Sequence, residues 1–220
     1  MKTKIENYYQ EDYFENYQKR IGDFGGKANL FKFEKYIKQT DTVLDFGCGG
    51  GFLLKNLYCS KKIGVELNPI ARDFCINKNQ IDCYENIDHI EDNTLDVIIS
   101  NHCLEHTLSP YELIDKMYKK LKINGKIIIV VPLDSYNYNW APNDINNHLY
   151  SFSPMNIGNL LQGCNFKNIN TDVIYHKWPP FYLLIDKYFG KYVFQFCCLI
   201  YGRLNRRWVQ VRGFGQKLND

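Results

Sequence analysis

A glycine-rich segment near residue 50 is the first part of the sequence whose spacing suggests chemistry. It reads Val43-Leu44-Asp45-Phe46-Gly47-Cys48-Gly49-Gly50-Gly51, with glycines at the first, third and fifth positions after an apolar run. Glycines there let the backbone turn tightly and point its N–H groups at a ligand. A dinucleotide fingerprint has glycines at the first, third and sixth positions instead. The Asp45 carboxylate would repel a phosphate but would suit an ammonium group or a sugar hydroxyl.

An acidic residue ends the next apolar run. Glu66 closes Gly64-Val65-Glu66, fifteen residues after Gly51. A carboxylate at the end of the second strand of such a unit can accept both hydroxyls of a ribose. The alternative is that the glycine-rich segment is only a turn and that the carboxylate of Glu66 has no function in binding.

These residues need strands that end at a common edge. Apolar runs alternate with helical patterns between residues 42 and 131, which predicts a doubly wound parallel sheet with right-handed crossovers. The predicted strands are Thr42–Phe46, Lys62–Glu66, Ile81–Tyr84, Leu95–Ser100 and Lys126–Val131, and the predicted helices are Phe52–Tyr58, one starting at Asn68-Pro69, and Pro110–Leu121.

The flanking regions follow other patterns. Before the sheet we expect helices at Tyr8–Arg20 and Lys27–Lys38, joined by a loop over residues 21–26. After it we expect a helix from Ser153-Pro154 to about Gly163, and two strands at Ile169–Tyr175 and Trp208–Phe214.

Four segments in this order resemble a known family. VLDFGCGGG, GVELNP, LDVIISNHCLEH and GKIIIVVP follow the motif order of class I S-adenosylmethionine-dependent methyltransferases, in detail from Asp41 to Val131 and more loosely to the C-terminus. The resemblance implies S-adenosylmethionine as cofactor and S-adenosylhomocysteine as product. It also implies a Rossmann-like α/β fold with a seven-stranded sheet, mostly parallel with the last strand antiparallel, flanked by helices. An aromatic helical insertion would separate the last two strands.

The resemblance also implies an organisation and a set of cofactor residues. We expect one domain over residues 1–220, with a helical cap (1–40), a cofactor-binding core (41–131) and an acceptor-side half (132–220) that contains the insertion 178–207. Asn101 and His102 would face the methyl-donating centre. Glu85-Asn86-Ile87 would sit against the adenine, with Asp88 as an alternative. The full set expected at the cofactor is Asp45, Phe46, Gly47, Cys48, Gly49, Glu66, Leu67, Asn68, Glu85, Asn86, Ile87, Asn101 and His102.

Methyl transfer to a hydroxyl needs a positioned nucleophile and a base that removes its proton. Ser100-Asn101-His102-Cys103 replaces the Asn/Asp-Pro-Pro-Tyr type of loop found in many enzymes that methylate amides or exocyclic amines, which argues against those acceptors. The candidate bases are therefore histidines. His102 could line the site or act in it, whereas His106 more simply holds its helix.

His148 is the stronger candidate. It lies in Pro142–Tyr150, a polar loop after the fifth strand, with Asp144 as a possible orienting carboxylate. The alternative is a turn-rich loop that satisfies its own backbone. NDINNHLYSFSPMNIGNLLQGCNF, followed by YHKWPP, resembles methyltransferases of bacterial surface-polysaccharide and glycan gene clusters. That resemblance implies O-methylation of a sugar that is free, nucleotide-linked or lipid-linked.

Two other functions stay open. The acceptor could be a lipid-like or aromatic small molecule, with the aromatic insertion as its pocket. The chain could also be a non-catalytic partner subunit that keeps the cofactor fold, although the intact glycine loop and Glu66 argue against this.

Composition excludes several classes of protein. The net charge of +3 is too balanced to argue for a nucleic-acid partner. The eight cysteines have no two-residue spacing, so we expect reduced thiols, no metal site and a cytoplasmic location. The longest uncharged apolar stretch, Tyr192–Gly202, is far shorter than the ~20 residues of a spanning helix.

The C-terminal insertion is unusually aromatic and basic. Eight aromatic residues lie between Phe181 and Tyr201, and four of the six arginines lie in the last eighteen residues: Arg203, Arg206, Arg207 and Arg212. The segment could line an acceptor pocket, form a homodimer interface, or contact a membrane or the phosphates of a nucleotide-sugar.

Overall fold

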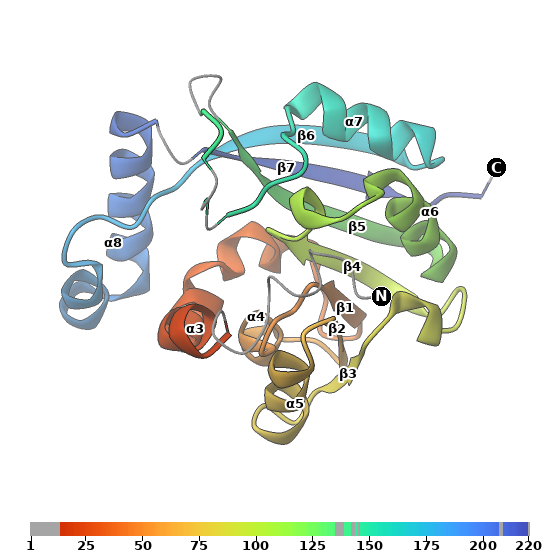
Figure 1. The fold of residues 1–220 in the computed structure, drawn as a ribbon, viewed down its shortest axis with the longest axis horizontal. Helices are drawn as coiled ribbons and strands as arrows, with labels where there is room; N and C mark the ends of the chain where they lie inside the picture. The colour runs from red at the N-terminus through yellow and green to blue at the C-terminus, as the bar shows by residue number, and fades with distance from the viewer. Residues whose placement is uncertain (1–13, 135–138, 142–143, 145, 207–208, 220) are drawn as a thin grey trace.

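The computed structural model describes residues 14–134, 139–141, 144, 146–206 and 209–219 (Figure 1). Its centre is a seven-stranded sheet in the order β3-β2-β1-β4-β5-β7-β6. Strands β1 to β5 pair in parallel, whereas β7 runs antiparallel to both β5 and β6. This confirms the predicted sheet. The strands are β1 Thr42–Phe46, β2 Lys61–Val65, β3 Asp82–Tyr84, β4 Leu95–Asn101, β5 Leu121–Leu133, β6 Lys167–Tyr175 and β7 Val209–Gln216.

Helices cover both faces of the sheet (Figure 1). The α-helices are α3 Lys19–Ala28, α4 Phe52–Asn56, α5 Pro69–Asn77, α6 Pro110–Lys120, α7 Pro154–Gly163 and α8 Tyr182–Leu204. Shorter helical turns are η1 Phe14–Gln18, η2 Leu30–Lys32, η3 Glu34–Tyr36, η4 Ile87–His89 and η5 Leu104–His106.

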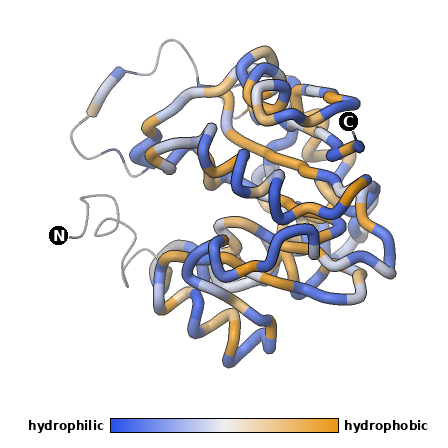
Figure 2. Tube along the Cα trace, turned by 90° about the vertical axis from the view of Figure 1, so that its right-hand side faces the viewer, coloured by the Kyte–Doolittle hydropathy of each residue, from blue (hydrophilic) through white to orange (hydrophobic). Residues whose placement is uncertain are grey.

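The central strands are buried on both faces. In β4, Ile98 packs in one core cluster with α6 and α7, whereas Val97 and Ile99 pack in another with α4 and α5. An almost wholly apolar run is expected of such a strand. Figure 2 shows hydrophobic stretches running through the middle of the fold, while hydrophobic and hydrophilic residues alternate along the helices.

The N-terminal region differs from the prediction. The expected loop over residues 21–26 is part of α3, because its glycines serve close packing instead of a turn. A Cβ at Gly26 would lie 2.2 Å from the backbone oxygen of Phe52, and one at Gly22 would lie 2.4 Å from the Phe52 ring. The expected helix Lys27–Lys38 is instead the end of α3 followed by η2 and η3, since Phe33 (φ −124°) breaks the helical run. Of the predicted helix Tyr8–Arg20, residues 8–13 lie outside the described residues, and the remainder forms η1 and the start of α3.

One edge of the sheet collects the residues of interest. The carboxyl ends of β1, β2, β4 and β5 lead directly to Gly47, Glu66, His102 and Asp134. Strand β6 is antiparallel to β7, which is antiparallel to β5, so β6 ends at the same edge. Helix α8 therefore begins on the side of the sheet where open α/β folds bind ligands.

Candidate active site

The glycine loop between β1 and α4 has the geometry that its sequence suggests. Gly47 (φ +76°), Gly49 (φ +54°) and Gly51 (φ +76°) all adopt left-handed conformations that disfavour other residues. A Cβ at Gly47 would lie 2.4 Å from the Cys103 sulfur. The backbone can therefore take this course only because these positions lack side chains.

Glu66 ties the loop to the second strand. Its Oε2 accepts a hydrogen bond from the Gly49 backbone N–H (2.8 Å), and its Oε1 accepts one from the Asn68 backbone N–H (2.9 Å). Burial raises the pKa of Glu66, and these two hydrogen bonds oppose that shift. The Asn68 side chain accepts from the N–H groups of Ile70 and Ala71 and so caps α5.

Asp45 is a buried acid at the base of the loop. Its side chain is 2% exposed, and Oδ1 has no hydrogen-bond partner among the described residues. Burial, and secondarily the charge of Glu66, raises the pKa of Asp45 to about 8. A bound cation would relieve this destabilised carboxylate. S-adenosylmethionine carries an ammonium and a sulfonium group, so the residues present fit that cofactor.

The remaining residues expected around the cofactor lie along the same edge with different exposure. Leu67 is exposed, and the Glu85 carboxylate, also exposed, lies 3.7 Å from the Arg72 guanidinium. Asn86 caps η4, whereas Ile87 is buried in the core. Asp88, the alternative at the adenine, pairs with Lys116 at 2.8 Å. Phe46 packs against the core and Cys48 is buried.

Three thiols meet beneath the loop, a cluster that sequence spacing could not indicate. The sulfurs of Cys48, Cys75 and Cys83 all lie within 4.8 Å of one another, with Cys48 and Cys83 3.6 Å apart. Gly64 makes room for them, since a Cβ there would lie 2.6 Å from the Cys48 sulfur. Three sulfurs at these distances could hold a soft metal ion.

A buried lysine contacts the end of β4. Lys32 is 1% exposed, and its Nζ donates to Asn101 Oδ1 at 2.9 Å. Burial lowers the pKa of Lys32 to about 7. The sequence did not identify Lys32 as part of the site, because a charged residue within a predicted helix is expected to face solvent. The neighbouring His102 adopts a left-handed conformation (φ +54°), which is uncommon for a residue with a side chain.

Glu105 is a buried acid beside two histidines of this edge. It is fully buried, and neither carboxylate oxygen has a hydrogen-bond partner among the described residues. Its Oε1 lies 3.6 Å from His102 Nδ1 and 3.7 Å from His106 Nε2. Its backbone oxygen accepts from the Leu149 N–H at 2.8 Å, which attaches the loop that carries His148.

His148 is paired with a carboxylate, although not with the expected one. Its Nδ1 lies 3.0 Å from Asp134 Oδ2, whereas the Asp144 carboxylate accepts from the backbone N–H groups of Asn146 and Asn147, both at 3.2 Å. The Asp134 hydrogen bond is the main cause that raises the pKa of His148, and Asp144 adds to this through space. Asp134 follows β5 directly, so the sheet itself positions this partner.

A second histidine lies beside this pair. The rings of His106 and His148 have centroids 5.1 Å apart, and burial is the main cause that lowers the pKa of His106. Ligand atoms of Glu105, His106 and His148 lie within 4.8 Å of one another, a spacing that would also suit a metal ion. The edge therefore gathers one histidine with a raised pKa and one with a lowered pKa.

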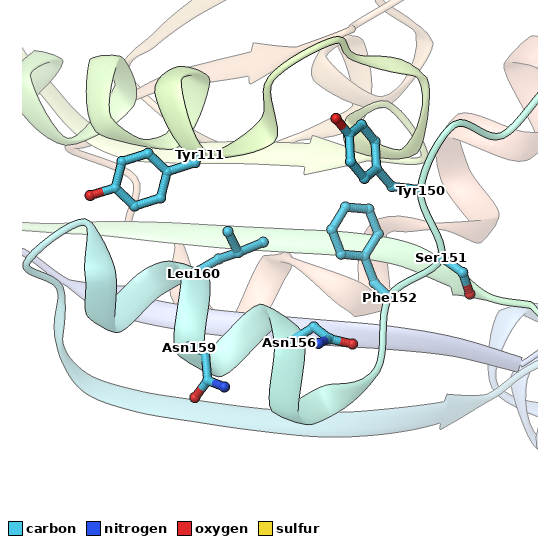
Figure 3. A pocket seen from close by; sticks show the side chains of 7 residues that line it. All are labelled: Tyr111, Tyr150, Ser151, Phe152, Asn156, Asn159 and Leu160. Atoms are coloured by element: carbon cyan, nitrogen blue, oxygen red, sulfur yellow. The ribbon is translucent and has the colours of Figure 1, made fainter.

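A hollow of about 380 Å³ opens two residues beyond His148 (Figure 3). The Tyr150 and Phe152 rings lie beside each other on one side, and amide side chains of α7 border the other. Its lining consists of Tyr111, Tyr150, Ser151, Phe152, Asn156, Asn159 and Leu160. None of these residues belongs to the glycine loop or to the other residues expected at the cofactor.

The C-terminal arginines do not all face solvent. Arg212, expected as a possible phosphate contact, is buried and makes a two-pronged pair with Asp172 (2.9 and 2.7 Å). It also donates to the Lys32 backbone oxygen at 3.0 Å. Arg203 and Arg206 are exposed, whereas Arg207 lies outside the described residues.

The fold matches solved methyltransferases. Phosphoethanolamine N-methyltransferase 2 of Haemonchus contortus, in complex with phosphomonomethylethanolamine and S-adenosylhomocysteine, aligns with a TM-score of 0.71 at 13% identity, over 100% of this chain and 61% of that one. A SAM-dependent methyltransferase from Archaeoglobus fulgidus aligns with a TM-score of 0.66 at 24% identity, over 94% of this chain and 100% of that one. These similarities establish the Rossmann-like methyltransferase fold.

Sequence relatives cover a shorter segment. Ribosomal protein L11 methyltransferase of Clostridium botulinum (strain Eklund 17B / Type B) is 37% identical over 68 residues, which are 30% of this chain and 22% of the relative. The Thermotoga maritima protein of the same name is 30% identical over 84 residues, or 34% and 32%. The matched segments thus span about a fifth to a third of these relatives.

The family comparison covers most of the sequence. A family described as a methyltransferase domain matches residues 9–171, which include the glycine loop, Glu66, Asn101 and His148. Together with the fold, this match confirms S-adenosylmethionine as the expected cofactor. The chain belongs to the methyltransferase-domain family.

Proposed function

We propose that this protein transfers the methyl group of S-adenosylmethionine to a sugar hydroxyl, in the synthesis of a surface polysaccharide or another glycan. The observation that carries the proposal is the pairing of His148 with Asp134, because O-methylation requires a base for the hydroxyl proton. A reaction in the cytoplasm would keep the eight free thiols reduced.

The chain's own residues supply distinct parts of this reaction. Gly47, Gly49 and Glu66 would hold the cofactor, and Asn101 and His102 would border its methyl group. When bound, the cofactor supplies an activated methyl group on sulfur. His148, oriented through Nδ1 by Asp134, would take the hydroxyl proton at Nε2 as the oxygen attacks the methyl carbon in line.

The polar surroundings of His148 support a sugar acceptor. Its loop is rich in asparagine, and the hollow whose lining begins two residues after His148 in the sequence combines the Tyr150 and Phe152 rings with the amides of Asn156 and Asn159. Amides can hydrogen-bond several hydroxyls, while the rings offer apolar faces to the C–H side of a sugar ring. A sugar held there would contact residues that follow His148 closely in the chain and that differ from those expected at the cofactor.

The proposal is tested by turnover of a panel of nucleotide-sugars, with S-adenosylhomocysteine formation and product mass as readouts. We expect one hydroxylated sugar to gain a single methyl group. His148→Ala should lower kcat by about 10²- to 10⁴-fold, the range for loss of a general base. Its affinity for S-adenosylmethionine should stay unchanged, which shows that the variant is folded.

Two results would contradict the proposal. Full activity of His148→Ala would exclude His148 as the base. Methylation of the amino group of amino sugars, with no product from their hydroxylated counterparts, would assign the chain to N-methylation.

A further inference from the structure

Helix α8 presents an unusually large apolar surface to solvent. Tyr192 is 89% exposed, and Phe189 and Phe196 are more than 60% exposed. Contiguous exposed apolar surface of this kind marks a contact site for another molecule. The large exposed apolar side chains of the segment are Phe181, Leu183, Leu184, Tyr188, Phe189, Tyr192, Val193, Phe196, Leu199, Ile200 and Leu204.

The other side of α8 is firmly packed, so this exposure does not reflect a detached segment. Phe194, Cys198 and Gly202, spaced four residues apart, are buried. Phe194 packs against Phe24 of α3, with ring centroids 5.3 Å apart. A Cβ at Gly202 would lie 2.7 Å from the backbone nitrogen of His176. These contacts hold α8 against α3 and the segment that follows β6; Figure 1 shows the helix at one side of the molecule.

Charge around this face is strongly one-sided. Lys187, Lys191, Arg203 and Arg206 are exposed, whereas Asp186 is the single acidic residue in the sequence from 177 to 206. Lys191 lies 3.3 Å from Glu34, but an exposed ion pair of this kind contributes little to stability. In a symmetric dimer the same patch meets itself, so these basic groups would repel each other. An anionic surface would instead attract them.

A basic hollow lies at the base of the helix. It has a volume of about 230 Å³, and its lining includes Lys35, Arg203 and the apolar Leu199. Arg212 and Asp172 also border it and form an ion pair with each other, so the net charge of the lining stays positive. Lysine and arginine beside apolar side chains form the combination that binds a phosphate at the boundary of a lipid layer.

The geometry suits a helix that lies on a bilayer. No helix in the described part of the chain is long and apolar enough to cross one. Gly190 (φ +79°, ψ 172°) interrupts α8 with a non-helical conformation, which divides its apolar surface into two segments. An interfacial helix needs only an apolar face and basic residues beside it. We infer that α8 docks this protein on an anionic phospholipid surface, with its aromatic face inserted among the headgroups.

This docking would bring the candidate active site to the membrane. Helix α8 starts at the sheet edge that also carries Glu66 and His148, so acceptors linked to lipid would be presented on that side. The docking itself does not depend on which molecule accepts the methyl group. It can therefore be tested without measuring turnover.

Flotation of the full chain with vesicles is the direct test. One set contains phosphatidylcholine alone, and the other contains phosphatidylcholine mixed with phosphatidylglycerol. We expect the protein to float with the anionic vesicles and to be released by high salt. The double variant Tyr192→Ser, Phe196→Ser should bind about tenfold more weakly or worse, because it removes apolar area that would be buried. Lys187→Gln should cost about fivefold, the effect of one basic residue at the surface.

Tyr58→Ser is the matched control, because Tyr58 is also an exposed aromatic residue (75%) but lies far from α8 in the sequence. It should float like the unmodified chain. The inference is overturned if the unmodified chain stays at the bottom of both gradients, or if Tyr58→Ser reduces flotation as much as the α8 variant. It is also overturned if the chain does not float and sedimentation instead reveals a dimer that the α8 variant dissociates.

Discussion

His148 and Asp134 form a paired imidazole and carboxylate at the carboxyl end of β5, with Nδ1 and Oδ2 3.0 Å apart. They are fourteen positions apart in the sequence, and part of the intervening segment lies outside the described residues. The pairing leaves Nε2 as the ring nitrogen that could receive a proton. It also raises the pKa of His148, chiefly through this hydrogen bond.

Replacing Asp134 should change the pH dependence of turnover. A histidine base must be neutral, so the activity of the unmodified enzyme should rise as pH passes through the raised pKa. Asp134→Asn removes the main cause of that raised pKa, so the acidic limb of the kcat profile should move to lower pH. The plateau should fall at least about tenfold, because the ring loses its orienting carboxylate.

Asp144→Asn is the comparison for this profile. Asp144 raises the same pKa only through space, and by less than Asp134 or Glu105 does, and its carboxylate is hydrogen-bonded to backbone N–H groups. The acidic limb should therefore move less than in Asp134→Asn. An equal or larger displacement would contradict the assignment of Asp134 as the orienting residue.

Replacing Glu66 should weaken cofactor binding. Glu66→Gln keeps the size of the side chain but loses the charge that accepts the loop N–H and would accept the ribose hydroxyls. Hydrogen bonds to a charged group are worth about 1.5–3 kcal/mol, so affinity for S-adenosylmethionine should fall by roughly 10- to 100-fold. Calorimetric titration measures this, with the exposed Glu91→Gln expected to bind normally. Equal affinity of the two variants would exclude Glu66 from the cofactor site.

Cofactor binding should release a proton from Asp45. With a pKa of about 8, this carboxyl group is mostly protonated at pH 7, and a neighbouring cationic ligand would favour its ionised form. The calorimetric enthalpy at pH 7 should therefore depend on the ionisation enthalpy of the buffer. The dependence should disappear well above pH 8, where the group is already ionised, and in Asp45→Asn. A buffer-independent enthalpy at pH 7 would contradict this account.

Two neighbouring glycines of α3 should respond oppositely to alanine. A Cβ at Gly26 would lie 2.2 Å from the Phe52 backbone oxygen, whereas one at Gly25 would lie 3.6 Å from the nearest atom, in Trp178. Gly26→Ala should lower the free energy of unfolding by about 1–3 kcal/mol, since backbone must move. Gly25→Ala should be neutral or stabilising by up to about 1 kcal/mol through helix propensity. Urea denaturation measures both, and equal effects would refute the packing role of Gly26.

Much of the sheet could be predicted because the relevant interactions are local. β5 is an apolar run that needs burial on both faces, and Asn68-Pro69 starts α5 with a cap and a proline at its first position. The glycine loop was also predictable, since only glycine adopts its left-handed conformations without strain. α3 was not, because Gly22 and Gly26 resemble turn residues until Phe52 packs against them.

The parts of the site that could not be predicted from the sequence depend on contacts between residues that are distant in the chain. Lys32 reaches Asn101 across 69 residues, and Asp134 reaches His148 across 14. Neither Lys32 nor Asp134 belongs to a motif, and Asp144 lies closer than Asp134 to His148 in the sequence. Asp134 is identified as the partner of His148 only once the sheet is formed, because it follows β5 at the edge where the strand ends meet. Likewise, the thiols of Cys48, Cys75 and Cys83 meet because the glycine loop, α5 and β3 come together in the folded chain.

The most direct test of the central claim is calorimetric titration of the unmodified chain with S-adenosylmethionine and, separately, with NAD⁺. The glycine spacing, the buried Asp45 and the position of Glu66 predict saturable binding of S-adenosylmethionine at one site and much weaker binding of NAD⁺. Tighter binding of NAD⁺, or no binding of S-adenosylmethionine by the folded chain, would contradict the account.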